Sequence, residues 1–338
     1  MITEKLHNCF AREGYDLKRA PEFEIASGYA PVNWALAKYW GKRDVALNLP
    51  AVSSLSVAVP LFTQTQIECA DADRLKIDGV ARAPESDAAK RLFAFADTVL
   101  GIERPGLDVR TFNNVPEATG FASSASGFAA FVTALNNLYG WEMDMPHLSI
   151  LARIGSGSAC RSLYPGFVKW HKGRRSDGMD SLAEPLAYSW PELRIGMIEV
   201  TRDEKPLGST AAMQHCAATS PKYKDWLAAN DTAIAGIEEA IAKRDMMRLV
   251  TTCEANALFM HETIRASAPL DDGTQLDYFL AETWDHLAAA RDLRVNQGIA
   301  IGTTMDAGPQ VKLLFHERDE AIVQQAFPSA DILEPWFG

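Results

Sequence analysis

The chain has 338 residues, 47 % of them hydrophobic and 23 % charged, which is enough for one large or two ordinary domains with a real core. Its formal net charge of −11 argues against general attraction to nucleic acid or acidic membranes, so an anionic ligand would need a local basic site. The first ten residues lack the apolar core of a signal peptide, and no stretch approaches the roughly 20 apolar residues of a membrane span, so we expect a cytoplasmic protein.

Five cysteines are scattered along the chain, without a CxxC pair and without a Cys/His cluster at metal-ligand spacing. They are Cys9, Cys69, Cys160, Cys216 and Cys253, and we expect all of them to be reduced thiols. Cys160 lies in a candidate binding segment, but we interpret it as a small buried filler because no partnered histidine is evident.

The N-terminal half favours a mixture of short strands and helices. Alternating β-branched and aromatic residues predict the strands, and apolar residues at 3.6-residue spacing predict the helices. The predicted strands are Phe23–Tyr29, Ser54–Val59, Thr65–Glu68, Leu107–Phe112 and Gly166–Trp170, and the predicted helices are Ser86–Leu100 and Ser126–Leu138. Residues 1–21 are expected to be an extension outside the fold, a solvated amphipathic tail.

From about Arg202 the pattern changes to long helical segments. The predicted helices are Ser209–Ala217, Lys222–Ala242, Met246–Ala266, Gln275–Arg291 and Arg318–Gln325. Two strands, Ile299–Thr304 and Gln310–Phe315, are expected to flank a tight turn at Asp306–Pro309, and a final strand is expected near Ile332. We place the boundary between two domains near residue 200.

Two segments combine positive charge with groups that hold anions. In the segment 33–44 (NWALAKYWGKRD), Lys38, Lys42 and Arg43 stand near two tryptophans and a tyrosine, in a chain with 33 basic and 44 acidic residues. The segment 155–162 (GSGSACRS) combines small residues, serine hydroxyls and an arginine, whose planar fork suits a carboxylate or phosphate. A serine-rich helix cap with an exposed arginine is the alternative for this second segment.

A third segment, Asn113–Gly127, is a small-residue loop that runs into a predicted helix. It lacks the Gly-Lys-Ser/Thr ending of a Walker A loop and contains no GxGxxG. Its serines at the start of the helix would present unsatisfied N–H groups and the positive end of the helix dipole, which together bind phosphate. A well-capped core helix is the alternative on these residues alone.

Taken together, these segments resemble the diphosphomevalonate decarboxylases, members of the GHMP kinase superfamily. The resemblance spans about residues 22–338 and rests on the segments 31–33, 38–44, 50–56, 113–127, 156–161 and 306–309. The lysine segment, the GSGSACRS segment and the DAGP turn are specific to the decarboxylases, whereas the serine loop alone indicates only the superfamily.

The resemblance implies a fold and a domain division. The fold is α+β and GHMP kinase-like, with an N-terminal lobe like domain 2 of ribosomal protein S5, a ferredoxin-like C-terminal lobe and an active-site cleft between the lobes. We therefore expect an N-terminal extension over 1–21, an N-terminal domain over 22–200 and a C-terminal domain over 201–338.

The resemblance also implies a reaction and its cofactors. It is the ATP-dependent decarboxylation of mevalonate 5-diphosphate to isopentenyl diphosphate, with release of carbon dioxide, ADP and phosphate. ATP and Mg²⁺ are expected as cofactors, without a named protein ligand for the metal, and a homodimer is expected because homodimers are common in the family.

By resemblance, three residues carry the reaction. Asp306 faces the C3 hydroxyl as general base or orienting acceptor, Lys38 neutralises charge during phosphoryl transfer, and Arg161 holds the substrate carboxylate. The positions around the substrate's diphosphate are matched by Tyr39, Lys42, Ser156 and Ser158. The loop that binds the ATP phosphates is matched by Asn113, Gly120, Ser123 and Ser124.

The chain departs from the family's pattern at two places. Val52 stands where the family commonly has Asn before two serines, and Leu36-Ala37 precede the lysine where the family commonly has Thr or Val with Leu or Ile. A phosphomevalonate decarboxylase or a mevalonate-derivative 3-kinase would share the fold and most motifs, and a non-catalytic ligand sensor is a further alternative. Lys38, Arg161 and Asp306 together favour the full decarboxylase.

Overall fold

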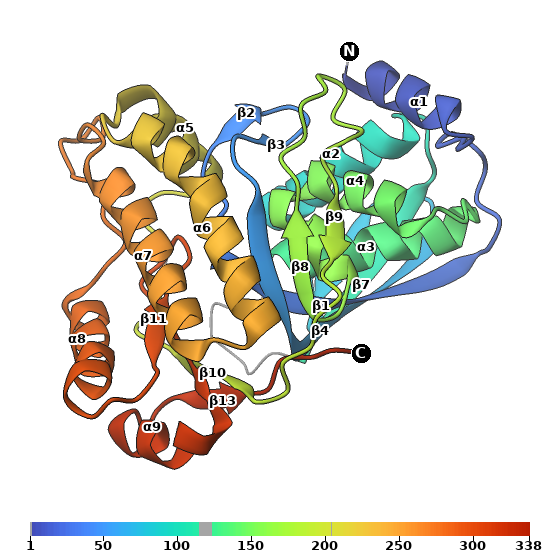
Figure 1. The fold of residues 1–338 in the computed structure, drawn as a ribbon. Helices are drawn as coiled ribbons and strands as arrows, with labels where there is room; N and C mark the ends of the chain where they lie inside the picture. The colour runs from blue at the N-terminus through green and yellow to red at the C-terminus, as the bar shows by residue number, and fades with distance from the viewer. Residues whose placement is uncertain (1, 115–123, 204) are drawn as a thin grey trace. The chain divides into compact units, whose positions relative to one another are not determined.

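The computed structural model describes residues 2–114, 124–203 and 205–338 (Figure 1). The helices are α1 (Ile2–Arg12), α2 (Asp87–Leu100), α3 (Ser124–Tyr139), α4 (Met145–Gly155), α5 (Ser209–Thr219), α6 (Tyr223–Lys243), α7 (Met246–Arg265), α8 (Ala281–Asn296), α9 (Glu320–Ala326) and the 3₁₀ helices η1 (Gly157–Leu163) and η2 (Glu317–Asp319). The strands are β1 (Ile25–Ala37), β2 (Lys42–Asp44), β3 (Leu49–Pro50), β4 (Ser54–Ala70), β5 (Arg74–Ile77), β6 (Val80–Arg82), β7 (Gly106–Asn113), β8 (Phe167–Trp170), β9 (Ala183–Pro185), β10 (Leu193–Ile198), β11 (Gly302–Thr304), β12 (Val311–His316) and β13 (Asp331–Leu333). Within these ranges, no helix has both the length and the apolar character needed to span a membrane.

The chain forms two compact units that are not consecutive blocks of sequence. Unit 1 consists of Met1–Asn33, Arg43–Leu49 and Leu61–Pro185, and unit 2 consists of Trp34–Lys42, Pro50–Pro60 and Leu186–Gly338. The division therefore differs from a single boundary near residue 200. The long strands β1 and β4 each contribute residues to both units, and a local sequence pattern does not reveal such sharing.

Unit 1 is built on a seven-stranded sheet. Its strand order is β6-β5-β7-β4-β8-β9, with β1 paired to β4. β4 and β7 are antiparallel from Thr63 opposite Asn113 to Ala70 opposite Gly106, so β7 ends where the predicted phosphate loop begins. The two strands predicted at 54–59 and 65–68 are one 17-residue strand, whose residues 54–59 are all buried and whose burial alternates from the exposed Pro60 to Ile67.

The core of unit 1 lies between its sheet and the helices α1 to α4. Apolar side chains of β4, β5 and β7 meet those of α2, α3 and α4 in one cluster. Leu6 and Phe10 of α1 are buried in the same cluster, and a ring nitrogen of His7 lies 2.7 Å from the Val99 carbonyl oxygen. Residues 1–21 are therefore not a solvated tail, since the apolar face of this amphipathic segment packs into the core.

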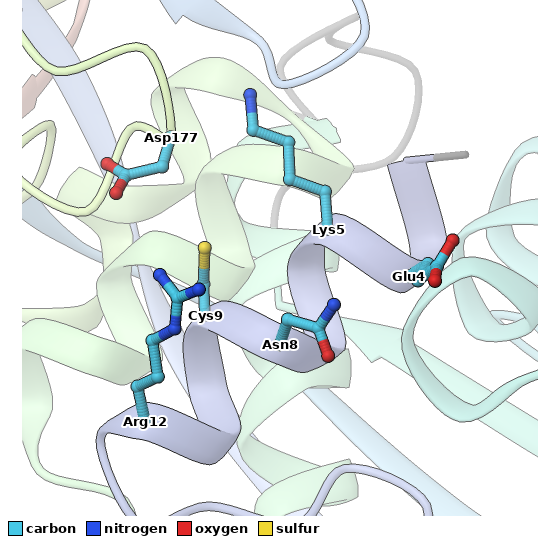
Figure 2. Close-up of a pocket in the computed structure, with 6 residues that line it drawn as sticks. All are labelled: Glu4, Lys5, Asn8, Cys9, Arg12 and Asp177. Carbon is cyan, nitrogen blue, oxygen red and sulfur yellow. The ribbon is translucent and has the colours of Figure 1, made fainter.

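Helix α1 borders a hollow of about 470 Å³ (Figure 2). It is lined by Glu4, Lys5, Asn8, Cys9, Arg12 and Asp177. Lys5 Nζ donates to the Ser176 carbonyl oxygen at 2.8 Å and so ties the helix to the loop on the other side. None of these residues belongs to the candidate catalytic set.

Unit 2 contains a four-stranded antiparallel sheet and the helices α5 to α9. The strand order is β11-β12-β10-β13, and Thr304 of β11 lies opposite Lys312 of β12. The predicted helices of this half are confirmed, except that α8 begins at Ala281 rather than near Gln275. Gln275 Nε2 instead donates to the carbonyl oxygens of Arg265 and Ser267, which holds the preceding segment against the end of α7.

A close approach of backbone fixes α3, the helix at the phosphate loop, against β1. A Cβ added to Gly28 would lie 2.1 Å from the Ala130 carbonyl oxygen and 2.4 Å from the Ala134 nitrogen. Both atoms belong to the α3 backbone, so a side chain at position 28 would push the helix away from the strand.

We therefore expect Gly28→Ala to lower the free energy of unfolding by about 2 kcal/mol or more, as forced overpacking does. Gly127→Ala is the matched control on α3, because a Cβ there meets nothing within 4 Å and removes a flexible glycine from a helix. Denaturant unfolding should show loss for the first variant and a gain of about 0.5 kcal/mol for the control. Equal stabilities for both variants would contradict the close approach.

Candidate active site

The predicted site residues fall into two groups, one in each unit. Unit 2 holds Lys38, Tyr39, Lys42 and Asp306, and unit 1 holds Asn113, Ser124, Ser156, Ser158 and Arg161. Gly120 and Ser123 lie outside the described residues and stay predictions. Each group is built from segments that are distant in sequence.

In unit 2 a carboxylate lies between two ammonium groups. Lys38 directly follows β1, and Asp306 follows β11 at the predicted turn. Lys38 Nζ lies 2.8 Å from Asp306 Oδ1, while Lys312 Nζ, on β12, donates to Oδ2 of the same carboxylate. The side chains of Lys38 and Lys312 are 2 % and 3 % exposed, whereas that of Asp306 is 46 % exposed. The Asp306 side chain is therefore partly exposed to solvent, while the two buried ammonium groups neutralise its charge.

The charges around Asp306 decide its protonation state. Burial raises the pKa of this carboxyl, but the positive charges of Lys312 and Lys38 outweigh burial and hold the pKa well below its ordinary value. Burial lowers the pKa of Lys38 to about 8, against the opposing attraction of Asp306. Asp306 is thus ionised at neutral pH, which suits it to accept a hydrogen bond and makes it a weak base.

Lys312 is a functional candidate that sequence reasoning missed. It interrupts the apolar strand VKLLF, and all five residues of that strand segment are buried. The signal in the sequence is a lysine inside an apolar strand pattern. Such a lysine would be buried, and lysine is almost never fully buried unless it is paired. Its Nζ lies 5.6 Å from the centroid of the Trp34 ring, within range of a cation–π interaction.

The surroundings of this ion pair carry further candidate contacts for an anion. Lys42 Nζ donates to Thr210 Oγ1 at 3.1 Å, at the first turn of α5. Tyr39 packs in the apolar cluster that also contains Ala307, the neighbour of Asp306. Lys205 is a further cation beside the turn, with its Nζ 3.9 Å from the position that a Cβ on Gly308 would occupy.

In unit 1 the amide of Asn33 organises the segment that carries Arg161. Asn33 Nδ2 donates to Ser162 Oγ at 2.6 Å and to the Ser158 carbonyl oxygen at 3.3 Å. Its Oδ1 accepts from Arg161 Nε at 3.3 Å, and the guanidinium lies 6.0 Å from the Trp170 ring centroid. Arg161 is only 3 % exposed, so the alternative of an exposed arginine in this segment is wrong.

Both ends of the predicted phosphate loop are held by one hydrogen-bond network. Thr63 Oγ1 is 2.8 Å from Asn113 Oδ1, at the first end of the segment 113–127, and 2.8 Å from Ser126 Oγ, near its second end. Asn113 Nδ2 also donates to Asp78 Oδ2 at 3.0 Å, so its amide anchors the loop. Ser124 Oγ lies 3.3 Å from Ser156 Oγ, which brings the start of α3 beside the GSGSACRS segment.

The cysteines take no part in this chemistry. All five are free, as predicted. Burial raises the pKa of Cys160 to about 12, and burial likewise raises the pKa of Cys253, near Lys38, to about 12. Both thiols therefore stay protonated, and the interpretation of Cys160 as a buried filler is confirmed. Over the described ranges, no three His, Cys, Asp or Glu side chains gather in a metal-binding cluster.

The comparisons with known proteins identify the family of this chain. A family model described as the diphosphomevalonate decarboxylase-like N-terminal domain matches residues 30–183. The diphosphomevalonate decarboxylase of Gibberella zeae is 36 % identical over 331 residues, covering 90 % of this chain and 84 % of the relative. The crystal structure of mevalonate diphosphate decarboxylase from Staphylococcus aureus has a TM-score of 0.84 at 32 % identity, covering 92 % of this chain and 96 % of that chain.

A second solved structure, MDDEF in complex with MVAPP, AMPPCP and magnesium, has the same TM-score of 0.84 at 32 % identity, covering 92 % of this chain and 98 % of that chain. The fold is therefore the GHMP kinase fold, as predicted. Within that class, the chain belongs to the diphosphomevalonate decarboxylase family.

The two lysines on Asp306 should be electrostatically coupled. Lys312 carries a like charge that lowers the pKa of Lys38, so Lys312→Met should raise the Lys38 pKa above about 8. NMR titration of labelled lysine side chains measures the Lys38 pKa, and the Lys38 signal is assigned by its loss in Lys38→Arg. Lys224→Met, an exposed lysine of the same unit, should leave the titration unchanged. A Lys38 pKa that stays the same or falls in Lys312→Met would contradict the arrangement.

Proposed function

We propose that this protein catalyses the ATP-dependent decarboxylation of mevalonate 5-diphosphate to isopentenyl diphosphate, with release of carbon dioxide, ADP and phosphate. The observation that carries the proposal is the Asp306 side chain held between the ammonium groups of Lys38 and Lys312. Membership of the decarboxylase family supports it. A cytoplasmic location and a homodimer belong to the same proposal.

Asp306 acts on the tertiary hydroxyl of the substrate. A hydroxyl is a poor leaving group, and its phosphorylation turns it into phosphate, whose departure is coupled to loss of the neighbouring carboxylate. The exposed side of the Asp306 carboxylate accepts the hydroxyl hydrogen bond and aims its oxygen at the transferring phosphoryl group. A loose phosphoryl-transfer transition state needs positioning more than strong proton abstraction, which agrees with the lowered pKa of Asp306.

Lys38 and Lys312 supply positive charge where negative charge develops. Their ammonium groups are buried and fixed by Asp306, so they need no reorganisation as the phosphoryl group moves. Lys38 Nζ also donates to the Ala35 carbonyl oxygen at 2.9 Å. The bonds to Asp306 and Ala35 use two of the three ammonium hydrogens and so fix the direction of the third. Lys38 thus stabilises charge during transfer and during departure of phosphate.

Arg161 holds the substrate carboxylate until carbon dioxide leaves. Its guanidinium is oriented by Asn33 and lies over Trp170, in surroundings from which water is largely excluded. A fixed planar fork recognises a carboxylate in one orientation, which aligns the C–C bond that breaks. Electrons of that bond then quench the positive charge that develops at the tertiary carbon.

The remaining predicted residues bind the phosphates of the two substrates. Tyr39, Lys42, Ser156 and Ser158 contact the diphosphate of mevalonate 5-diphosphate in this proposal. Gly120, Ser123, Ser124 and Asn113 belong to the loop for the ATP phosphates, with Asn113 anchoring its first end. The start of α3 at Ser124 adds the positive end of a 16-residue helix.

Mg²⁺ fits the oxygen donors beside this loop. The Ser124 and Ser156 hydroxyls, 3.3 Å apart, are hard neutral ligands of the kind that Mg²⁺ accepts, and Ser124 would hold it together with the phosphates of ATP. Mg²⁺ held there would supply positive charge that offsets the negative charge of the ATP phosphates. The solved complex of MDDEF contains MVAPP, AMPPCP and magnesium together, which supports both cofactors.

Product analysis tests the reaction. Purified protein with Mg-ATP and mevalonate 5-diphosphate should release carbon dioxide and ADP in equal amounts, and mevalonate 5-phosphate should give neither. Asp306→Asn should abolish both products, because the amide loses the charge that the two lysines hold, while Asp271→Asn, an exposed control in the same unit, should be unaffected.

The failing outcomes of this assay are distinct. ADP without carbon dioxide would mean a 3-kinase, and activity on the monophosphate alone would mean a phosphomevalonate decarboxylase. Neither product from any substrate would favour a ligand sensor.

Removal of the buried guanidinium should severely impair the enzyme. Arg161→Ala should lower kcat/KM, with a loss of about 2–5 kcal/mol in transition-state stabilisation, as truncation of a buried charged contact does. Arg161→Lys keeps the charge without the fork and should recover only part of the loss. Arg174→Ala, an exposed arginine of the same unit, is the control. Steady-state kinetics showing normal kcat/KM in Arg161→Ala would remove Arg161 from the mechanism.

A further inference from the structure

Helix α7 directs three polar side chains at the backbone of the two segments that carry Lys38 and Asp306. Asn256 Oδ1 accepts from the Lys38 backbone N–H at 2.8 Å, and His261 Nε2 lies 2.9 Å from the Asp306 carbonyl oxygen. The Glu254 carboxylate accepts from both the N–H and the hydroxyl of Thr303, at 3.0 Å each. Because these bonds reach the main chain, they set where the two catalytic side chains originate.

His261 holds the Asp306 carbonyl oxygen through its Nε2–H group. A carbonyl oxygen only accepts hydrogen bonds, so Nε2 donates and carries the proton. The ring is fully buried, with its centroid 4.0 Å from that of Phe279, and its Nδ1 has no hydrogen-bond partner among the described residues. Burial lowers the His261 pKa to about 3, so the ring is neutral at physiological pH. A phenylalanine would fill this space without burying an unsatisfied nitrogen, and packing alone therefore does not explain a histidine.

The contact between α7 and the strand before Asp306 is tight. A Cβ added to Gly302, the first residue of β11, would lie 2.7 Å from the Val250 Cβ and 2.8 Å from the Val250 carbonyl oxygen. Thr304, at the end of the same strand, is 1 % exposed, and its hydroxyl lies 3.3 Å from the Ala35 carbonyl oxygen. The strand thus has little freedom between α7 and the end of β1.

We propose that α7 is the positioning helix of the active site: Asn256 fixes the backbone at Lys38, and His261 fixes the backbone at Asp306, so that the ammonium and the carboxylate meet. Neither residue touches the substrate in this proposal; both act through the residues that they hold. The kinetic consequence rests on the proposed function, whereas the placement of Lys38 against Asp306 is testable in the free protein.

The titration of Lys38 reports this placement. The Lys38 ammonium faces three titratable groups: Asp306, Lys312 and the Cys253 thiol on α7. The charge of Asp306 raises the Lys38 pKa, and the charge of Lys312 lowers it. When the turn at Asp306 is released, the carboxylate holds Lys38 less strongly while Lys312 still repels it. The Lys38 pKa should then fall below about 8, in the direction opposite to that expected for Lys312→Met.

The experiment compares His261→Phe, which keeps the ring volume and loses the donor, with His261→Gln, whose amide nitrogen restores a donor. Asn256→Leu and Asn256→Asp form the corresponding pair for the acceptor. The control is Thr263→Val, a fully buried polar residue of α7 whose hydroxyl donates to the Phe259 carbonyl oxygen within the helix. For each folded variant we measure thermal unfolding, the Lys38 titration by lysine NMR, and kcat and KM.

His261→Phe and Asn256→Leu should lower kcat at least tenfold with little change in the KM for ATP, and His261→Phe should lower the Lys38 pKa by at least half a pH unit. His261→Gln and Asn256→Asp should recover most of kcat, and Thr263→Val should match the unaltered protein in kcat and titration. The proposal is overturned if His261→Phe loses only thermal stability, or if His261→Gln does no better than His261→Phe.

The lysine titration separates this proposal from the proposed function. If the unaltered protein made no carbon dioxide, the reaction assignment would fail, but a lowered Lys38 pKa in His261→Phe would still support positioning by α7. If the unaltered protein is active and the Lys38 pKa is unchanged in His261→Phe, the positioning proposal alone fails.

Discussion

The ion triad of Lys38, Asp306 and Lys312 is the interaction on which the rest of the site depends. Two buried ammonium groups would be costly without a partner, and one carboxylate serves both. The carboxylate stays ionised because of them, and Lys38 keeps its proton at neutral pH because of the carboxylate. Removing Lys312 therefore changes the electrostatic surroundings of both Asp306 and Lys38.

The fold supplies each member of the triad from a rigid element. Lys38 follows the end of β1, Asp306 follows β11, and Lys312 lies on β12, directly opposite Thr304. α7 runs past all of these segments and bonds to two of their backbones. In unit 1, polar side chains likewise position the candidate residues. Asn33 orients Arg161, and Thr63 joins the two ends of the predicted phosphate loop. Backbone and amide contacts, rather than long flexible side chains, thus fix the reacting groups.

The sequence suffices to propose Lys38, Arg161 and Asp306 as catalytic residues, but not to find the residues that position them. Lys38, Arg161 and Asp306 stand in short motifs with distinctive composition, and the long helices of unit 2 follow from their apolar spacing. Asn256 and His261 lie in an ordinary helical pattern, and their partners are respectively 218 and 45 residues away. The sequence does not reveal Lys312, because its pairing with Asp306 depends on the register of β11 and β12. The packing of residues 1–21 cannot be predicted from the sequence, because an amphipathic segment has the same composition whether its apolar face is solvated or packed.

In the proposed reaction, Asp306 is an ionised acceptor and not a proton-holding acid. The most direct measurement is NMR titration of aspartate side-chain carboxyl carbons in the free protein, with the Asp306 signal assigned by its loss in Asp306→Asn. We expect that signal to stay at its ionised position from pH 8 down to the lowest pH at which the protein remains folded, because both lysines hold the Asp306 pKa below its ordinary value. A titration with a pKa at or above that of an ordinary aspartate, about 3.9, would contradict the account.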